Sequence, residues 1–299
     1  MYHQITRNKR MSILVVVLFL LFWLLAGFLI GSASGSLAGA IVGTVVLGLL
    51  AVGAGLYSYF LGAATVLAVS GARAADPQQF QQLHNIVETL AIGDGLPKPQ
   101  VYVIDDPSPN AFATGRNPQH AAVTVTTGLL QMMNREELEG VLSHEMSHIK
   151  NFDVRLILIL ATMVGLAGLL ASFVWRAAFT IRTRDFRVTL VILAIGLVFG
   201  IIAVIVGPLM QMALSRQRES LADASGVELT RNPTGLISAL KKISMNDKPL
   251  QRFNHATAAM CIDNPSEHHG SFWGHLFDTH PPVQERIAAL EKIFSVKET

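Results

Sequence analysis

The chain has 299 residues, of which 51% are hydrophobic and 15% are charged. Because soluble domains carry about 25% charged residues, this composition excludes an ordinary soluble domain and predicts a membrane protein with a soluble part. The formal net charge of +2 gives no electrostatic reason to expect nucleic-acid binding. Cys261 is the only cysteine, so an internal disulfide is excluded and a reducing compartment is compatible.

Two apolar runs open the chain. A polar, basic segment at residues 2–10 precedes an uncharged apolar run at residues 12–30, which is long enough to cross a bilayer. A cleaved signal peptide is the alternative, but no polar sequence follows the run. The second run, residues 37–69, is longer than a usual span, so we expect its end to leave the bilayer or to tilt. Glycines at positions 35, 39 and 43 predict close packing of these spans.

The basic residues of segment 2–10 place the N-terminus in the cytoplasm by the positive-inside rule, and two spans return the chain to that side. A helix is then expected from Asp76-Pro77 onward, and strands at residues 101–104 and 121–127. Between the strands lies a segment of mainly small residues, Asn110, Ala111, Phe112 and Ala113. It either binds a peptide substrate by strand addition or forms a structural turn.

The next helix carries the main chemical motif. Asn134 with Glu137 predicts a capping box at its start. His144 and His148 follow at i and i+4, so a helix presents both imidazoles on one face. Two neutral imidazoles can hold Zn²⁺, and the carboxylate of Glu145 can take a proton from water on the metal. Two surface histidines on a helix are the alternative, which a third ligand would exclude.

A later helical stretch supplies candidates for that ligand. Glu219 and Asp223 stand at i and i+4, so Glu219 can complete the metal site and Asp223 can hydrogen-bond a ligating imidazole. The alternative is a pair of carboxylates on a solvated helix face.

Apolar runs at residues 156–174 and 188–214 separate the two motifs and predict a second membrane hairpin. The loop between them holds four arginines, which conflicts with the positive-inside rule if the site is cytoplasmic. Either the first spans dominate the topology or this hairpin does not cross. We expect two crossings, which place both motifs in one compartment.

The last part of the chain is predicted to hold a helix at residues 234–243 and a final helix after Pro281-Pro282. The polar stretch 244–279 contains four histidines, whose spacing suits a loop over the cleft better than a second metal site. His280 either stabilises a transition state or caps the turn.

These motifs together resemble the HtpX-type membrane zinc metalloproteases, a family that also includes the prenyl-protein CAAX proteases. The resemblance covers essentially the whole chain, in the family's order. It implies one Zn²⁺ per chain held by His144, His148 and Glu219, with Glu145 as the base and Asp223 behind the metal. It further implies a multi-pass protein of the bacterial inner membrane, whose cytoplasmic active site cleaves misfolded or damaged membrane proteins. No ATP-binding loop occurs in the sequence.

The expected fold is a mainly α membrane protein with four transmembrane helices and an α+β, zincin-like (gluzincin) cytoplasmic protease domain. Residues 1–70 would form the tail and first two spans, and residues 154–214 the second hairpin. The protease domain would comprise residues 71–153 and 215–299. A zinc-dependent sensor is a rival, but three ligands and Glu145 leave a metal position open. A transporter would place charges inside its spans, and the runs 12–30, 37–69 and 156–174 contain none.

Overall fold

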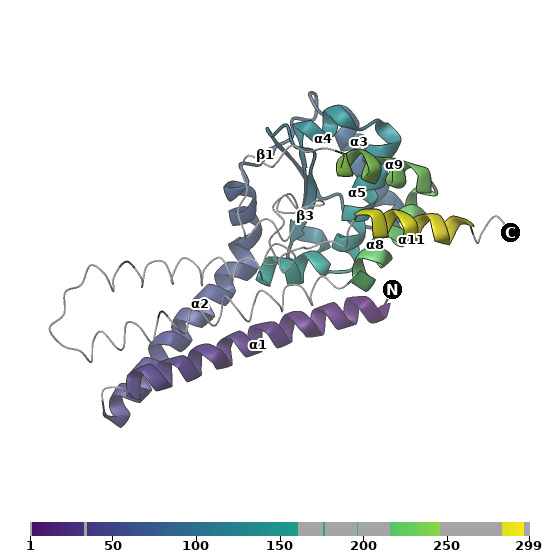
Figure 1. The fold of residues 1–299 in the computed structure, drawn as a ribbon. Helices are drawn as coiled ribbons and strands as arrows, with labels where there is room; N and C mark the ends of the chain where they lie inside the picture. The colour runs from purple at the N-terminus through teal and green to yellow at the C-terminus, as the bar shows by residue number, and fades with distance from the viewer. Residues whose placement is uncertain are drawn as a thin grey trace.

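The computed structural model describes residues 2–32, 35–160, 176, 196, 216–245 and 283–295. In these residues a pair of long helices extends from one end of a domain built from helices and a small sheet (Figure 1). Most of the predicted second hairpin lies outside the described residues, as do the histidine-containing stretch 246–282 and with it His280.

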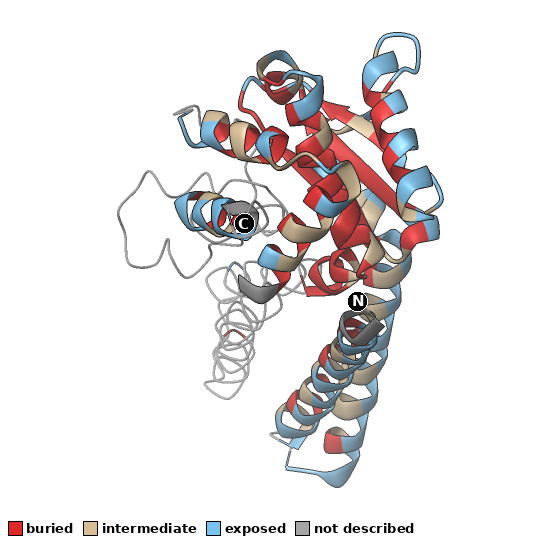
Figure 2. Cartoon of the chain, turned by 90° about the vertical axis from the view of Figure 1, so that its right-hand side faces the viewer, coloured by how far each residue is buried: buried red, intermediate tan, exposed pale blue. Residues whose placement is uncertain are grey.

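The two long helices are α1 (Tyr2–Ser32) and α2 (Leu37–Val69). Both are long and apolar enough to cross a membrane. Large aliphatic side chains are exposed along both helices, as expected where lipid covers them (Figure 2). The predicted polar tail is part of α1 and not a separate segment, because no proline or glycine interrupts the helix between residues 2 and 12.

Glycines bring α1 and α2 into backbone contact. A Cβ on Gly31 would overlap the backbone of Gly39, and one on Gly27 would overlap that of Gly43. The predicted close packing is therefore confirmed for positions 39 and 43. Gly35 has a different role: it lies in the link between the helices with φ +72°, a conformation that glycine adopts without strain.

The sheet has four strands in the order β1-β2-β4-β3. They are β1 (Arg73–Ala74), β2 (Gln100–Ile104), β3 (Ala111–Gly115) and β4 (Ala121–Thr126). β2 and β4 are parallel, whereas the β1–β2 and β3–β4 pairs are antiparallel. Both predicted strands are confirmed. The last turns of α2 pack against the sheet, where Val66 contacts the cluster of Ile104 and Phe112. The end of the second span therefore joins the domain.

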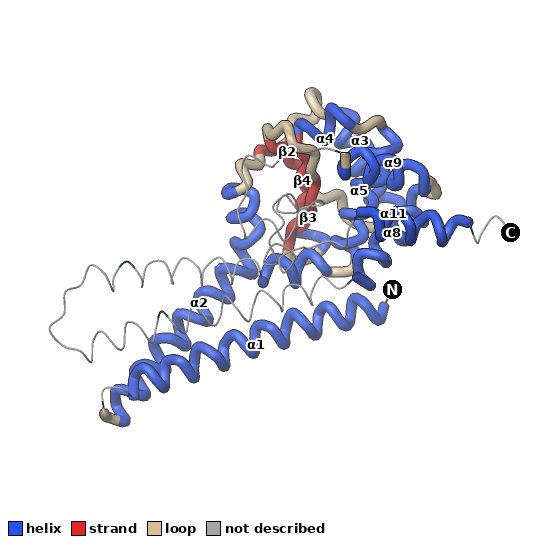
Figure 3. The backbone as a smooth tube through the Cα atoms, viewed as in Figure 1, coloured by secondary structure: helices blue, strands red, loops and turns tan. Residues whose placement is uncertain are grey.

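Helices surround α5 (Arg135–Lys150), as the tube view shows (Figure 3). They are α3 (Gln81–Asp94), α4 (Thr127–Met132), α8 (Arg216–Thr230), α9 (Pro233–Ser244) and α11 (Val283–Ser295). The apolar side chains on one face of α3 are buried, and Leu138, Val141 and Leu142 of α5 complete the core beneath them. Ser143 and Ser147 of α5 are polar but buried, because α8 covers that side of the helix.

Candidate metal centre

The predicted capping box fixes the start of α5. Asn134 Oδ1 accepts a hydrogen bond from the Glu137 backbone N–H at 2.9 Å, and Glu137 Oε2 accepts one from the Asn134 N–H at 2.9 Å. Glu137 also accepts hydrogen bonds from Ser238 and Lys242 of α9 at 2.6 and 2.7 Å. The start of α5 is therefore held by its own capping residues and by α9. These contacts fix the rotation of α5 about its axis and so the direction in which its histidines point.

His144, His148 and Glu219 meet in the interior with ligand atoms that all lie within 4.8 Å of one another. The two Nε2 atoms are 3.1 Å apart, and each is 3.5 Å from an oxygen of Glu219. α8 can approach α5 closely because Gly226 faces Ser143 there, and a Cβ at Gly226 would lie 2.9 Å from the Ser143 hydroxyl. The three side chains form a cluster that could hold one metal ion.

Each histidine is oriented by a carboxylate on its other ring nitrogen. His144 Nδ1 lies 2.8 Å from Asp223 Oδ1, and His148 Nδ1 lies 3.0 Å from Asp153 Oδ2. Because carboxylates accept, each Nδ1 carries a proton, which leaves each Nε2 facing the cluster as the atom that can bind a metal ion. Phe152, with φ +61°, interrupts the helix after α5, and Asp153 follows it directly at the start of the next helical residues.

Sequence reasoning did not identify Asp153 or Arg286 as parts of the site. Arg286 in α11 holds Asp223 with two hydrogen bonds, from Nε at 3.0 Å and from a terminal nitrogen at 2.6 Å. The only sequence signal for Arg286 was a charge among the apolar positions of the last helix, next to Ile287 and Leu290. A buried arginine of this kind needs a carboxylate partner, which here is Asp223.

The electrostatics of the cluster favour positive charge. Burial opposes protonation of His148, but the charge of Glu219 and the hydrogen bond to Asp153 raise its pKa to about 9. Burial and the nearby Arg286 likewise oppose protonation of His144, but Asp223 and Glu219 together raise its pKa. Burial disfavours the charged form of Asp223, yet Arg286 and His144 hold its pKa well below the usual range. The same carboxylates that stabilise the protonated histidines would also stabilise a bound cation.

The other predicted residues that the structure describes lie on α5 or on the segment that packs beside it. Glu145 is buried on α5, and its charge acts on both His148 and Arg286. Ala111, Phe112 and Ala113 belong to β3, with Asn110 just before it, so the alternative of a structural turn is wrong. Within the described chain β3 is an end strand of the sheet, and it packs beside α5.

The cluster lies next to the start of α1. Asn8 donates hydrogen bonds to the carbonyl of Asn151 at 2.9 Å and to Asp153 at 2.6 Å. Lys9 lies over the ring of Phe152, 4.4 Å from its centroid. The helical residues 153–160 then pack against α1 through Val15, Leu156 and Ile159. The metal cluster is thus built directly beside the membrane helices.

Comparison with known proteins places this arrangement in a family. Residues 77–294 match the model of peptidase family M48. A protease HtpX homolog of Lactobacillus helveticus is 43% identical over 310 residues, which cover 98% of this chain and 100% of the relative. One from Ligilactobacillus salivarius is 46% identical over 301 residues, covering 97% and 99%. A crystal structure of S. mikatae Ste24p aligns with TM-score 0.46 and 18% identity, covering 78% of this chain and 56% of that one.

The family match extends from just before α3 into α11 and therefore includes every residue of the cluster. Together with the two apolar helices, it identifies a membrane protein of the HtpX type. The chain belongs to peptidase family M48 and is a metallopeptidase.

Proposed function

We propose that the chain is a zinc endopeptidase whose metal is held by His144, His148 and Glu219. Two ligands of a tetrahedral zinc ion at ~2.0–2.1 Å lie roughly 3.3–3.4 Å apart. The corresponding separations here are 3.1, 3.5 and 3.5 Å, which fits such an ion without rearrangement of the side chains. Two histidines and one carboxylate form the donor set of zinc sites that keep a position open for catalysis. This cluster is the observation that carries the proposal.

Glu145 acts as the general base in this account. Zn²⁺ supplies Lewis-acid polarisation of the peptide carbonyl and makes water nucleophilic near neutral pH. Glu145 takes the proton of the attacking water and passes it to the amide nitrogen as the peptide bond breaks. Its position next to His144 on a buried helix excludes bulk water, which strengthens its electrostatic interactions.

Asp223 and Asp153 keep the two imidazoles in the required tautomer, and Arg286 keeps Asp223 ionised and in place. Partners of this kind fix ring orientation and raise the basicity of the ligating nitrogen. His280 remains a proposed stabiliser of the transition state.

Substrate binding is assigned to β3. The Thr126 N–H donates to the carbonyl of Asn110 at 2.9 Å, and the register then pairs Phe112 with Thr124. Because hydrogen-bonding positions alternate along an antiparallel pair, the backbone groups of Ala111 and Ala113 point away from β4. An extended substrate can add to those groups as a further strand, and their small side chains leave room for it.

The proposed substrates are misfolded or damaged membrane proteins, cleaved at the cytoplasmic face of a bacterial inner membrane. Two observations support this assignment: the cluster adjoins the start of α1, and basic residues fill that part of the helix. The protease domain would be divided between residues 71–153 and 215–299, with a second membrane hairpin at residues 154–214 between them.

Cleavage by the purified chain, reconstituted in liposomes, tests the proposal. We expect hydrolysis of an unfolded soluble protein, loss of hydrolysis with a zinc chelator and recovery on adding Zn²⁺. A membrane protein with a destabilising mutation, reconstituted beside the enzyme, should be cut faster than its folded parent. Equal cleavage of the two forms would refute the substrate class alone, whereas chelator-insensitive cleavage would refute the metal mechanism.

A further inference from the structure

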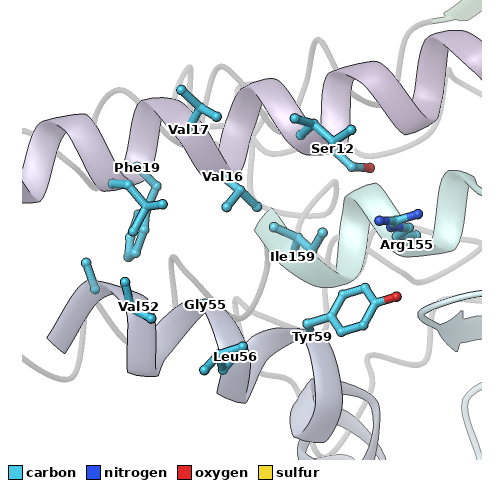
Figure 4. Close-up of a pocket in the computed structure, with 13 residues that line it drawn as sticks. Ser12, Val16, Val17, Phe19, Val52, Gly55, Leu56, Tyr59, Arg155 and Ile159 are labelled. Carbon is cyan, nitrogen blue, oxygen red and sulfur yellow. The ribbon is translucent and has the colours of Figure 1, made fainter. Parts of the chain in front are cut away.

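A cavity of about 350 Å³ lies between α1, α2 and the helical residues 153–160. Its walls are almost entirely apolar, with Val16 and Phe19 from α1, Val52 and Leu56 from α2, and Ile159 between them (Figure 4). All of the α1 and α2 residues fall within the candidate membrane spans. The cavity is therefore an intramembrane space with hydrocarbon as its natural surroundings.

One end of the cavity is polar and positively charged. Arg155 and Tyr59 lie there beside Ser12, whereas Phe19 and Val52 lie at the other end (Figure 4). The guanidinium of Arg155 is 5.4 Å from the centroid of the Tyr59 ring, and its buried Nε has no hydrogen-bond partner. Such a nitrogen carries a desolvation penalty that an acceptor in the cavity would relieve.

A second arginine reinforces this charge. Arg116 lies 5.7 Å from the centroid of the same Tyr59 ring and 5.0 Å from that of Phe60. Among the ion pairs of the described residues, neither Arg116 nor Arg155 has a carboxylate partner. Arg116 is not among the residues that line the cavity, but it adds positive charge beside the same ring. The Arg155 guanidinium does line the cavity and offers a site for an anion, since arginine binds phosphate groups well.

We propose that this cavity binds one anionic phospholipid, with an acyl chain between α1 and α2 and its phosphodiester at Arg155. The apolar walls suit a hydrocarbon chain, part of which can occupy a space of about 350 Å³. An acyl chain is narrow enough to enter. Basic pockets between membrane helices bind anionic headgroups in this way. The assignment does not depend on the proposed peptidase mechanism.

Two glycines of α2 provide a matched pair of variants. Gly55 lines the cavity, and a Cβ added there meets nothing within 4 Å, so Gly55→Leu fills the space. Gly53 is equally open to a Cβ and does not line the cavity, which makes Gly53→Leu the control. Arg155→Met removes the charge at the polar end and keeps an apolar chain of similar length.

The experiment measures lipid retained by the full-length protein. The protein is equilibrated in nanodiscs of equimolar phosphatidylglycerol and phosphatidylcholine and then transferred to detergent for native mass spectrometry. The wild type should retain phosphatidylglycerol about fivefold over phosphatidylcholine. Arg155→Met should abolish that preference, Gly55→Leu should abolish retention of both lipids, and Gly53→Leu should match the wild type. Circular dichroism and size-exclusion chromatography check folding, and Arg155→Met carries the test if Gly55→Leu does not fold.

Four results would overturn the proposal. Arg155→Met could keep the preference for phosphatidylglycerol, in which case the headgroup does not bind at this end. Retention could be unchanged in Gly55→Leu or abolished by inorganic phosphate, which would make the site a surface anion site without an acyl chain. A peptide containing a membrane span could displace the lipid one for one, which would assign the cavity to substrate.

Discussion

The side-chain amide of Asn8 donates a 2.6 Å hydrogen bond to Oδ1 of Asp153, across 145 positions of sequence. The other oxygen of Asp153 holds His148 Nδ1 at 3.0 Å, so one carboxylate joins the first membrane helix to the metal cluster. Asn8 and Asp153 are 1% and 3% exposed, which means that water cannot replace a lost partner at low cost. The position of His148 therefore depends on how α1 is seated against the domain.

Removing the Asn8 amide should weaken metal binding. In Asn8→Ala the carboxylate of Asp153 loses a donor and holds His148 less firmly, so we expect the zinc dissociation constant to rise about tenfold. Competition with a chromophoric chelator measures this constant. Asn85→Ala, at an exposed position of α3, is the control and should leave it unchanged. Equal constants in wild type and Asn8→Ala would show that α1 does not influence the site.

Glu219 and Asp223 should differ in their effect on the metal. Glu219→Ala removes a ligand, so most of the zinc should be lost after dialysis. Asp223→Asn keeps the shape but weakens the hydrogen bond to His144, and its zinc affinity should fall roughly 10- to 100-fold. Metal analysis of the two purified variants compares them. If Asp223→Asn emptied the site while Glu219→Ala stayed loaded, the two roles would be reversed.

The metal-free protein should lose stability as the pH rises from 6.5 towards 9. Burial opposes the charged form of His148, but Glu219 and Asp153 raise its pKa from 6.5 to about 9 on folding. Protonation of His148 therefore contributes its full stabilisation below pH 6.5. This contribution is lost as the pH rises through the folded-state pKa of about 9. Thermal unfolding with a chelator should show a falling midpoint in that window, which His148→Gln should lack. A midpoint that stays level or rises would contradict the charge assignment.

Local signals in the sequence predicted much of this site. The capping box of Asn134 and Glu137, the strands at β2 and β4, and the shared face of His144 and His148 depend on residues close together in the chain. Apart from the approach of Glu219 and Asp223 to the histidines, contacts between distant segments were not predicted. Burial of Ser143 requires α8, and the role of Arg286 requires the packing of α11 onto Asp223. The strand conformation of Ala111–Gly115 likewise follows from its pairing with β4, since its small residues alone favour a turn equally.

The orientation of the chain can be tested with single cysteines after Cys261 has been replaced. Ser143 is fully buried and unsuitable, but Ser220 is exposed on α8 and Ser36 is exposed in the link between α1 and α2. In intact cells a membrane-impermeant thiol reagent should label Ser36→Cys and leave Ser220→Cys unlabelled until the membrane is opened. A cysteine at Thr183 tests the predicted second hairpin, which crosses if this position is labelled from outside. The reverse pattern at positions 36 and 220 would place the active site outside the cytoplasm.

The most direct test of the central claim compares metal content and peptide hydrolysis in Glu145→Gln. The substitution keeps the size of the side chain and all three proposed ligands but removes the base, so the protein should still bind one zinc per chain. Its turnover of an unfolded protein should fall by about 10²- to 10⁴-fold, as expected for the loss of a general base. Proteolysis near the wild-type rate by a zinc-loaded Glu145→Gln protein would contradict the mechanism.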